Sequence, residues 1–171
     1  GSGQAIRLLA DVNYGSLDSI KFTGKSLTIY GPYEPEPGVN PLSRPLNLIG
    51  TTTPAVSVRG DKTALILDGV VAKSTAAIMS GVSGAAQCTD QAILTFRRSV
   101  IRESTLLPGI YTNNCSNLTV DRTQIIKNAG AIQMIGNIGY YLIQNSLIVN
   151  NENMNSMRST IVLGEGIGII Q

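Results

Sequence analysis

The chain has 171 residues, of which 43% are hydrophobic, so it is long enough and apolar enough to fold as one domain with a sizeable core. Charged residues make up only 14% and the net charge is +2, which excludes attraction to nucleic acid on charge alone. Histidine is absent, so imidazole catalysis and the commonest metal ligand are excluded too. No apolar run approaches the roughly 18 residues that a transmembrane helix needs, so no transmembrane segment is expected.

Residues 4–30 contain short alternations of apolar and polar side chains, separated by turn residues, and this pattern predicts short strands. No stretch of the chain shows the spacing of an amphipathic helix, so little or no α-helix is expected. Residues 31–47 hold five of the seven prolines. They are predicted to form a loop that projects from the body, and this loop carries Tyr33 as a candidate contact residue.

From residue 55 onward the sequence repeats, most clearly between Leu118 and Asn151, where LTVDRTQII is followed 23 residues later by YLIQNSLIV. A repeat of this length, with short strands and no helix, is typical of a solenoid, in which stacked turns bury a core that one turn cannot bury alone. Aligning the repeats gives three apolar columns: Leu65, Leu94, Leu118 and Tyr141; Leu67, Phe96, Val120 and Ile143; and Ala72, Ile101, Ile125 and Ile148. Leu27 and Ile29 fit the first two columns as an earlier member.

The phrases AILTFRRSVIRES, GIYTNNCSNLTVDRTQIIKNAG and YYLIQNSLIVNN resemble coils of the right-handed parallel β-helix superfamily, the pectate-lyase-like fold. The resemblance implies an all-β, single-stranded right-handed parallel β-helix of about five to six coils, forming one domain over residues 1–171. Residues 1–30 would form the first coil, residues 31–47 the proline-rich insertion, and residues 55–171 the regular coils. The superfamily includes polysaccharide lyases and hydrolases, phage tailspikes and adhesins, so the resemblance indicates the fold and not the activity.

A charged column follows one of the predicted strands. Asp68, Arg97, Asp121 and Gln144 share this position, so adjacent coils place Arg97 between two carboxylates. The simplest interpretation is a ladder of surface ion pairs worth roughly a few tenths of a kcal/mol each. Under a sharper interpretation, Asp68, Arg97 and Asp121 form an acid/base or calcium site, because lyases of the resembled family use clustered Asp with Ca²⁺ and a nearby Arg or Lys as base. Arg98 and Arg122 supply the same residue type beside them. The family's motif strings are absent, however, and outside this interpretation no catalytic residue, cofactor or metal is expected.

A second column is polar and uncharged. Thr75, Ser104, Asn128 and Asn151 share a position at the following turn. Side chains of this kind hydrogen-bond to the backbone and to one another along a stack. The column resembles the asparagine ladder of the superfamily, and we expect its role to be structural.

The two cysteines, Cys88 and Cys115, lie in the connections before the same predicted strand of successive coils, so the fold brings their loops together. One interpretation is a Cys88–Cys115 disulfide, which would stabilise the fold by roughly 3 kcal/mol. The other is a pair of buried free thiols. Two sulfurs without histidine provide too few ligands for a metal site.

Strong ladders, a neutral polar surface and the lack of a catalytic constellation favour a non-enzymatic structural or adhesive module, outside the cell or on its surface. A β-helix has open strand edges at both ends unless they are capped, and the C-terminal GIGIIQ is apolar without a charged or helical cap. We therefore expect either that the chain is a fragment of a longer β-helix or that its end pairs with another subunit. Identical subunits stacked end to end would form a filament. The candidate contact residues are Ile6, Leu8, Tyr33, Ile167, Ile169 and Ile170.

Two alternative functions remain open at this stage. The first is a carbohydrate-binding domain, or a lyase or hydrolase acting on polysaccharide, in which case Ca²⁺ would be the cofactor of a lyase. The second is a segment of a phage or adhesin fibre, which would trimerise along its side rather than stack at its ends.

Overall fold

A computed structural model of the chain describes residues 3–8, 13–14, 24–31, 47–51, 54–75, 84–104, 106–151, 161–162 and 165–171. All regular secondary structure in these residues is β-strand, which confirms the prediction of an all-β fold without α-helix. No helix in this part of the chain is long and apolar enough to cross a membrane. Most of the proline-rich loop predicted at residues 31–47, including Tyr33, lies outside the described residues.

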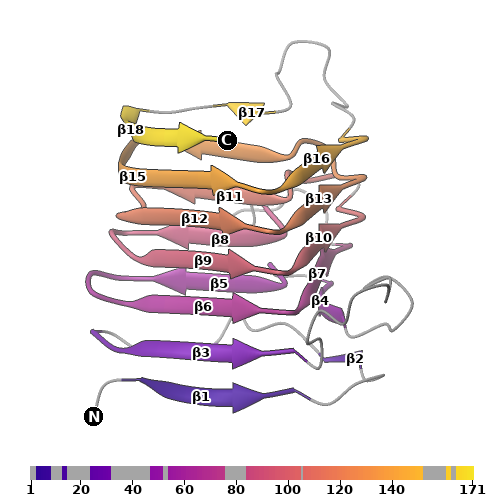
Figure 1. The fold of residues 1–171 in the computed structure, drawn as a ribbon, viewed down its shortest axis with the longest axis horizontal. Helices are drawn as coiled ribbons and strands as arrows, with labels where there is room; N and C mark the ends of the chain where they lie inside the picture. The colour runs from indigo at the N-terminus through magenta and orange to yellow at the C-terminus, as the bar shows by residue number, and fades with distance from the viewer. Residues whose placement is uncertain are drawn as a thin grey trace.

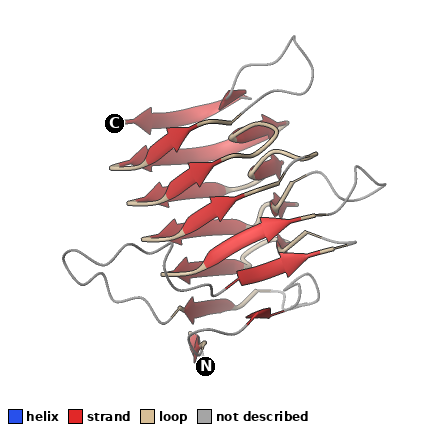
Figure 2. Ribbon diagram, turned by 90° about the vertical axis from the view of Figure 1, so that its right-hand side faces the viewer, coloured by secondary structure: helices blue, strands red, loops and turns tan. Residues whose placement is uncertain are grey.

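The described strands form three parallel sheets, which we call A, B and C (Figures 1 and 2). Sheet A contains, in order, β1 (Gln4–Arg7), β3 (Ser26–Tyr30), β6 (Ala64–Asp68), β9 (Ile93–Arg97), β12 (Asn117–Asp121), β15 (Asn137–Gln144) and β18 (Glu165–Ile170). Sheet B contains β2 (Asn13–Tyr14), β4 (Asn47–Gly50), β7 (Val71–Ser74), β10 (Val100–Arg102), β13 (Gln124–Ile126) and β16 (Leu147–Val149). Sheet C contains β5 (Val56–Arg59), β8 (Ala86–Thr89), β11 (Ile110–Asn113), β14 (Ile132–Ile135) and β17 (Ile161–Val162).

From β3 onward the chain passes through sheets A, B and C in rotation, so each circuit adds one strand to every sheet. The strands of one sheet stack roughly 4.8 Å apart, and the two termini lie at opposite ends of the stack (Figure 1). This arrangement is compatible with a β-helix-like fold. The described strands number seven in sheet A, six in sheet B and five in sheet C, against an expectation of about five to six coils.

The strand register confirms all three apolar columns. Leu65 pairs with Leu94, Leu94 with Leu118, and Leu118 with Tyr141. The columns that begin at Leu67 and Ala72 are paired in the same way, and β3 extends the first two toward the N-terminus. Because successive side chains of a strand point to opposite faces, a slip of one residue would move a whole column out of the core, and the apolar pattern therefore determines the register.

The interior is formed by the inward-facing members of these columns. Leu65, Leu94, Phe96 and Ile101 are completely buried, and the adjoining inward residues belong to the same continuous core. Burial of a side chain of this size stabilises the fold by roughly 2 kcal/mol relative to leaving it exposed. The core therefore runs along the axis of the stack and positions the polar residues at the turns between sheets.

Candidate functional site

The candidate catalytic residues lie at the C-terminal ends of neighbouring strands in sheet A. Asp68 ends β6, Arg97 ends β9, Asp121 ends β12 and Gln144 ends β15. The register pairs these residues in that order, so the predicted column is confirmed. The Cα atoms of the two aspartates are separated by two strand spacings, about 9.6 Å, with the Cα atom of Arg97 between them.

The guanidinium that binds Asp68 belongs to Arg98 rather than to Arg97. Arg98 donates from Nε to Oδ1 of Asp68 at 2.7 Å and from Nη2 to Oδ2 at 2.5 Å. Arg97 is exposed, and none of the ion pairs within the described residues includes it. Arg98 occupies the tight turn from sheet A to sheet B with a φ of 46°, in the left-handed region, and Arg122 and Asn145 have φ of 48° and 51° at the same turn of the next coils. At this turn, the side chains of Arg98 and Asn145 reach back to an aspartate of the preceding coil. The side chain of Arg122 reaches Asp121 at the end of its own strand.

Asp121 is enclosed by the same kind of turn. Its Oδ1 accepts hydrogen bonds from Gln144 Nε2 at 3.2 Å and Asn145 Nδ2 at 3.3 Å, and its Oδ2 accepts one from Arg122 Nε at 3.2 Å. Burial raises the pKa of Asp121, whereas the hydrogen bonds from Asn145, Arg122 and Gln144 and the charge of Arg122 lower it. The pKa of Asp121 lies below its ordinary value as the net result, so the side chain is ionised at neutral pH.

The arrangement of the two carboxylates favours a structural role over proton transfer. Asp68 and Asp121 are each only 7% exposed, and both oxygens of each accept side-chain hydrogen bonds. A general base needs an oxygen within hydrogen-bond reach of a substrate proton, and Ca²⁺ needs about six to eight oxygen ligands. Within the described ranges, no three or more His, Cys, Asp and Glu lie together in a way that could hold a metal ion. The network is instead one of nearly buried, satisfied charges, in which losing one partner destabilises the fold.

A ladder of hydroxyl side chains, absent from the predictions, runs beside the charged column. Ser99, Thr123 and Ser146 each follow a member of that column by two residues. Their hydroxyl oxygens accept hydrogen bonds from the backbone N–H groups of Val70, Ser99 and Thr123 in the preceding coil at 3.3, 3.4 and 3.2 Å. The same hydroxyls donate to the carbonyl two residues earlier, at 2.7 to 3.0 Å. The constant offset from the charged column was the signal that could have revealed this ladder.

The predicted asparagine ladder is present and buried. The backbone N–H of Ser104 donates to Asn128 Oδ1 at 3.1 Å, and the N–H of Asn128 donates to Asn151 Oδ1 at 3.1 Å. Asn128 Nδ2 also donates to the carbonyl oxygen of Ile101 at 3.1 Å and to Asn151 Oδ1 at 2.9 Å. The amide of Asn128 therefore joins its own coil to the neighbours on both sides.

The first member of this ladder is Ser74 and not Thr75. The backbone N–H of Ser74 donates to Ser104 Oγ at 3.2 Å, and Ser74 is buried, whereas Thr75 is exposed. In the next coil, Glu103 precedes Ser104 with a φ of 58°, which adds a residue before the ladder position. Strand β7 continues through Ser74 without such a residue, so counting from the apolar column placed the ladder one position too late.

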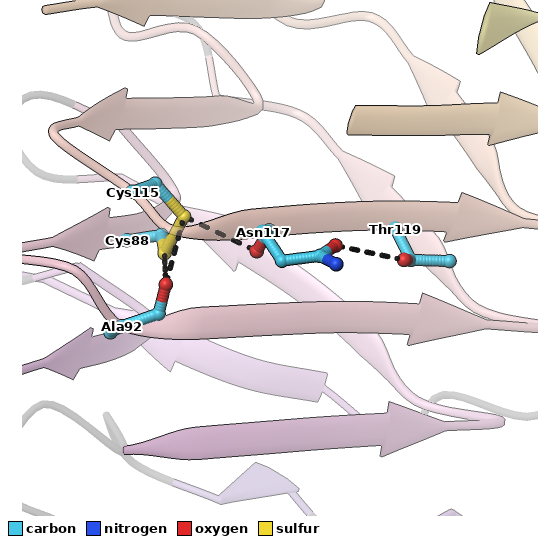
Figure 3. The surroundings of a disulfide bond; sticks show 5 residues. All are labelled: Cys88, Ala92, Cys115, Asn117 and Thr119. Atoms are coloured by element: carbon cyan, nitrogen blue, oxygen red, sulfur yellow. Dashed lines mark hydrogen bonds between the residues drawn. A yellow bond between two sulfur atoms is a disulfide. The ribbon is translucent and has the colours of Figure 1, made fainter. Parts of the chain in front are cut away.

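Cys88 and Cys115 form a disulfide with a Cα–Cα distance of 5.5 Å (Figure 3). Cys88 lies on strand β8 with its side chain in the core, rather than in a loop as expected, and Cys115 lies in the turn after β11. Both sulfurs are buried and lie 3.4 Å from the carbonyl oxygen of Ala92. Because β8 and β11 are neighbours in sheet C, the disulfide joins two successive coils.

The candidate contact residues do not form one surface. Leu8 is only 9% exposed and belongs to the core, whereas Ile167 and Ile169 on β18 are 75% and 44% exposed. The register of β18 places Ile167 and Ile169 on the outer face of sheet A, alternating with the inward position of Gly168. Leu8, Ile167 and Ile169 therefore do not lie at an exposed end of the core.

Ile6 and Ile170 are the two candidates that do mark the ends. Ile6 pairs with Ile29 and Ile170 pairs with Ile143, so both continue the same inward-facing column. They are nevertheless 47% and 51% exposed, because each lies on the outermost described strand of sheet A. Tyr33, the remaining candidate, lies outside the described residues.

Comparisons with known proteins add no family to this description. No family model, no curated protein and no solved structure matches the chain. The functional argument therefore depends on the fold and on the side chains described above.

Proposed function

We propose that the chain is a non-enzymatic structural module of an extracellular or cell-surface protein, folded as one right-handed parallel β-helix domain of the pectate-lyase-like type over residues 1–171. The observation that carries this proposal is the use of its buried polar side chains. The aspartates of the charged column, the hydroxyl ladder and the asparagine ladder all form hydrogen bonds between successive coils. Side chains that bond successive coils to one another keep the coils in register, and this use supports a structural role.

The disulfide supports a location outside the cytosol. Disulfides form and persist in secreted and surface proteins, whereas cytosolic thiols are kept reduced. The part of the chain that the structure describes has no free cysteine, which fits an oxidising environment. A low content of charge, 14%, gives a surface of neutral polar side chains that suits a passive scaffold.

The module is proposed to associate with copies of itself through its ends. Within the described residues, the outermost strands of sheet A, β1 and β18, each pair with one neighbour, which leaves one edge of each without a described partner. An open edge of this kind is a template for another strand. Analytical ultracentrifugation of the 171-residue chain over a range of concentrations tests this part of the proposal. If only monomers are found at high concentration, self-association is contradicted. Compact trimers without longer species would support the fibre-segment alternative instead.

A carbohydrate-binding or polysaccharide-cleaving function is the second candidate, favoured by one group on the outer face of sheet C. Tyr111 is half-buried there, and the register places the half-buried Gln133 on one side of it and Gln87, which is only 7% exposed, on the other. The ring of Tyr111 offers a face on which a sugar could stack, and the amide of Gln133 offers a hydrogen-bond donor and acceptor beside it.

Incubation with a panel of neutral and acidic polysaccharides, with and without Ca²⁺, separates the two candidates. We expect neither retention on the polysaccharides nor release of unsaturated products. Calcium-dependent product release that is abolished in Asp121→Asn would replace the structural proposal with a lyase. Retention without product release, lost in Tyr111→Ala but kept in Arg97→Ala, would establish binding on sheet C.

A further inference from the structure

The turn that links β5 to β6 carries the tripeptide Arg59–Gly60–Asp61. Strand β6 lies between β3 and β9 in sheet A, so this turn lies on the side of the stack rather than at an end (Figure 1). Gly60 has a φ of 100°, in the region that favours glycine. The backbone N–H of Thr63 donates to the carbonyl oxygen of Gly60 at 3.2 Å, which closes a tight turn with Asp61 and Lys62 at its two central positions.

This turn is one residue longer than the corresponding turns of the next two coils. Residues 60–63 link β5 to β6, whereas residues 90–92 link β8 to β9 and residues 114–116 link β11 to β12. The strands that these turns link pair in continuous register in sheets C and A. The turn accommodates its additional residue with both central residues, Asp61 and Lys62, exposed.

The two charged side chains of the tripeptide are accessible. The Arg59 side chain is 79% exposed, and its Nε donates to Oδ2 of Asp90 in the next coil. Among the described residues, no ion pair or hydrogen bond engages the two Nη atoms of Arg59 or the carboxylate of Asp61. An exposed ion pair such as that of Arg59 with Asp90 is weak, so it opposes the binding of Arg59 to another partner only slightly.

The chemistry of the turn defines the partner that would recognise it. A guanidinium forms paired, charge-assisted hydrogen bonds with the carboxylates of a partner. A carboxylate that is not engaged within its own chain provides an oxygen ligand for a divalent cation. Exposed turns on a rigid scaffold are common places for binding residues.

We propose that this turn is an adhesion site for a cell-surface receptor. The receptor binds the Asp61 carboxylate through a divalent cation that it holds itself, and it binds the Arg59 guanidinium through acidic side chains. Arg-Gly-Asp is the sequence that receptors of this chemistry recognise. The inference rests on the extracellular or cell-surface location in the proposed function and adds a partner to it.

Binding of a purified integrin of the Arg-Gly-Asp-recognising class to the immobilised 171-residue chain tests the inference. We expect saturable binding in Mg²⁺, which EDTA abolishes and a soluble Arg-Gly-Asp peptide competes away. Asp61→Glu keeps the charge and moves the carboxylate by one methylene, so it should weaken binding by about tenfold or more. The matched control is Asp90→Asn, which removes the carboxylate of the neighbouring coil and releases Arg59. It should bind at least as tightly as the unmodified chain.

Circular dichroism of each variant establishes that it is folded. If Asp61→Glu does not fold, peptide competition decides instead, because an Arg-Gly-Asp peptide should compete and an Arg-Gly-Glu peptide should not.

Four outcomes would overturn the inference. The first two are no binding by the unmodified chain in Mg²⁺, and binding that survives EDTA. The others are equal binding by Asp61→Glu and the unmodified chain, and a loss in Asp90→Asn as large as that in Asp61→Glu. Each of these outcomes leaves the structural role standing, because ultracentrifugation and the polysaccharide panel test that role separately.

Discussion

Removing the disulfide between Cys88 and Cys115 is the perturbation whose size the structure defines best. The bond closes an interval of 27 residues and joins β8 to the turn after the next strand of sheet C. Both half-cystines are buried and lie against the core, so no rearrangement of solvent-exposed loops intervenes. Its contribution therefore comes mainly from restricting the unfolded chain.

Loop closure over 27 residues corresponds to an entropy of about −12 cal/mol/K, which is about 3.5 kcal/mol at about 25 °C. The double variant Cys88→Ala/Cys115→Ala should lose this amount and roughly 1 kcal/mol more, because two buried sulfur atoms are deleted from a packed interior. The reduced form of the unmodified chain keeps those atoms and should lose the loop-closure part alone.

Urea denaturation at neutral pH measures the free energy of unfolding of the oxidised chain, the reduced chain and the double alanine variant. Reduction has to be carried out in denaturant, followed by refolding in the presence of a phosphine, because the buried bond is inaccessible in the folded protein. An oxidised-to-reduced difference below about 1 kcal/mol would refute the loop-closure reasoning. A large loss in the alanine variant without one in the reduced chain would assign the effect to packing.

Three further predictions concern the polar ladders. Arg98→Ala should lower the free energy of unfolding by about 2 kcal/mol in urea titrations, because it leaves the nearly buried carboxylate of Asp68 unpaired. The loss is not larger because a third of the Arg98 side chain is exposed and solvent screens the ion pair. The control Arg97→Ala should change the free energy of unfolding by less than about 0.5 kcal/mol, and equal effects of the two variants would contradict the assignment of the ion pair. Asn128→Ala should lower the free energy of unfolding by about 3 kcal/mol, since two donated hydrogen bonds and one accepted from the backbone are lost in the interior. Thr75→Ala, at an exposed position, is the control and should lower it by less than about 1 kcal/mol. Because the pKa of Asp121 is lowered in the folded state, its contribution is present above the ordinary carboxyl pKa of about 3.9 and is lost as the pH falls through the lower folded value. The stability difference between the unmodified chain and Asp121→Asn should therefore shrink below about pH 4, and a difference that stays constant down to about pH 2 would show that the charge of Asp121 is not involved.

Much of the fold could be predicted because the repeat is written in apolar residues. The columns of Leu65, Leu67 and Ala72 are paired across the sheets as expected, since a position buried in one coil is buried in all of them. The charged column was located by the same alignment. Placement by column does not specify which side chain meets which, and this is why Arg97 was expected to lie between the carboxylates while Arg98 binds Asp68.

Turn geometry accounts for the other differences. A single residue in the left-handed conformation, such as Glu103, shifts the ladder position by one, so Ser74 and not Thr75 begins the asparagine ladder. Cys88 was expected in a loop because no apolar alternation surrounds it, although AQCT forms strand β8. Backbone conformation at single residues is decided by contacts with the neighbouring coils, and the local sequence carries little information about it.

The sequence by itself determined the strand content, the register of the core and the positions that stack, because burial of apolar side chains is periodic and each coil repeats the choice of the last. Only the tertiary structure decided how the polar residues are used. Hydrogen bonds between coils depend on ångström-scale distances set by left-handed turns, as at Asp121 and Asn128. The same limit applies to the ends: exposure at Ile6 and Ile170 is visible only once the strands are stacked, because the residues themselves are ordinary members of a core column.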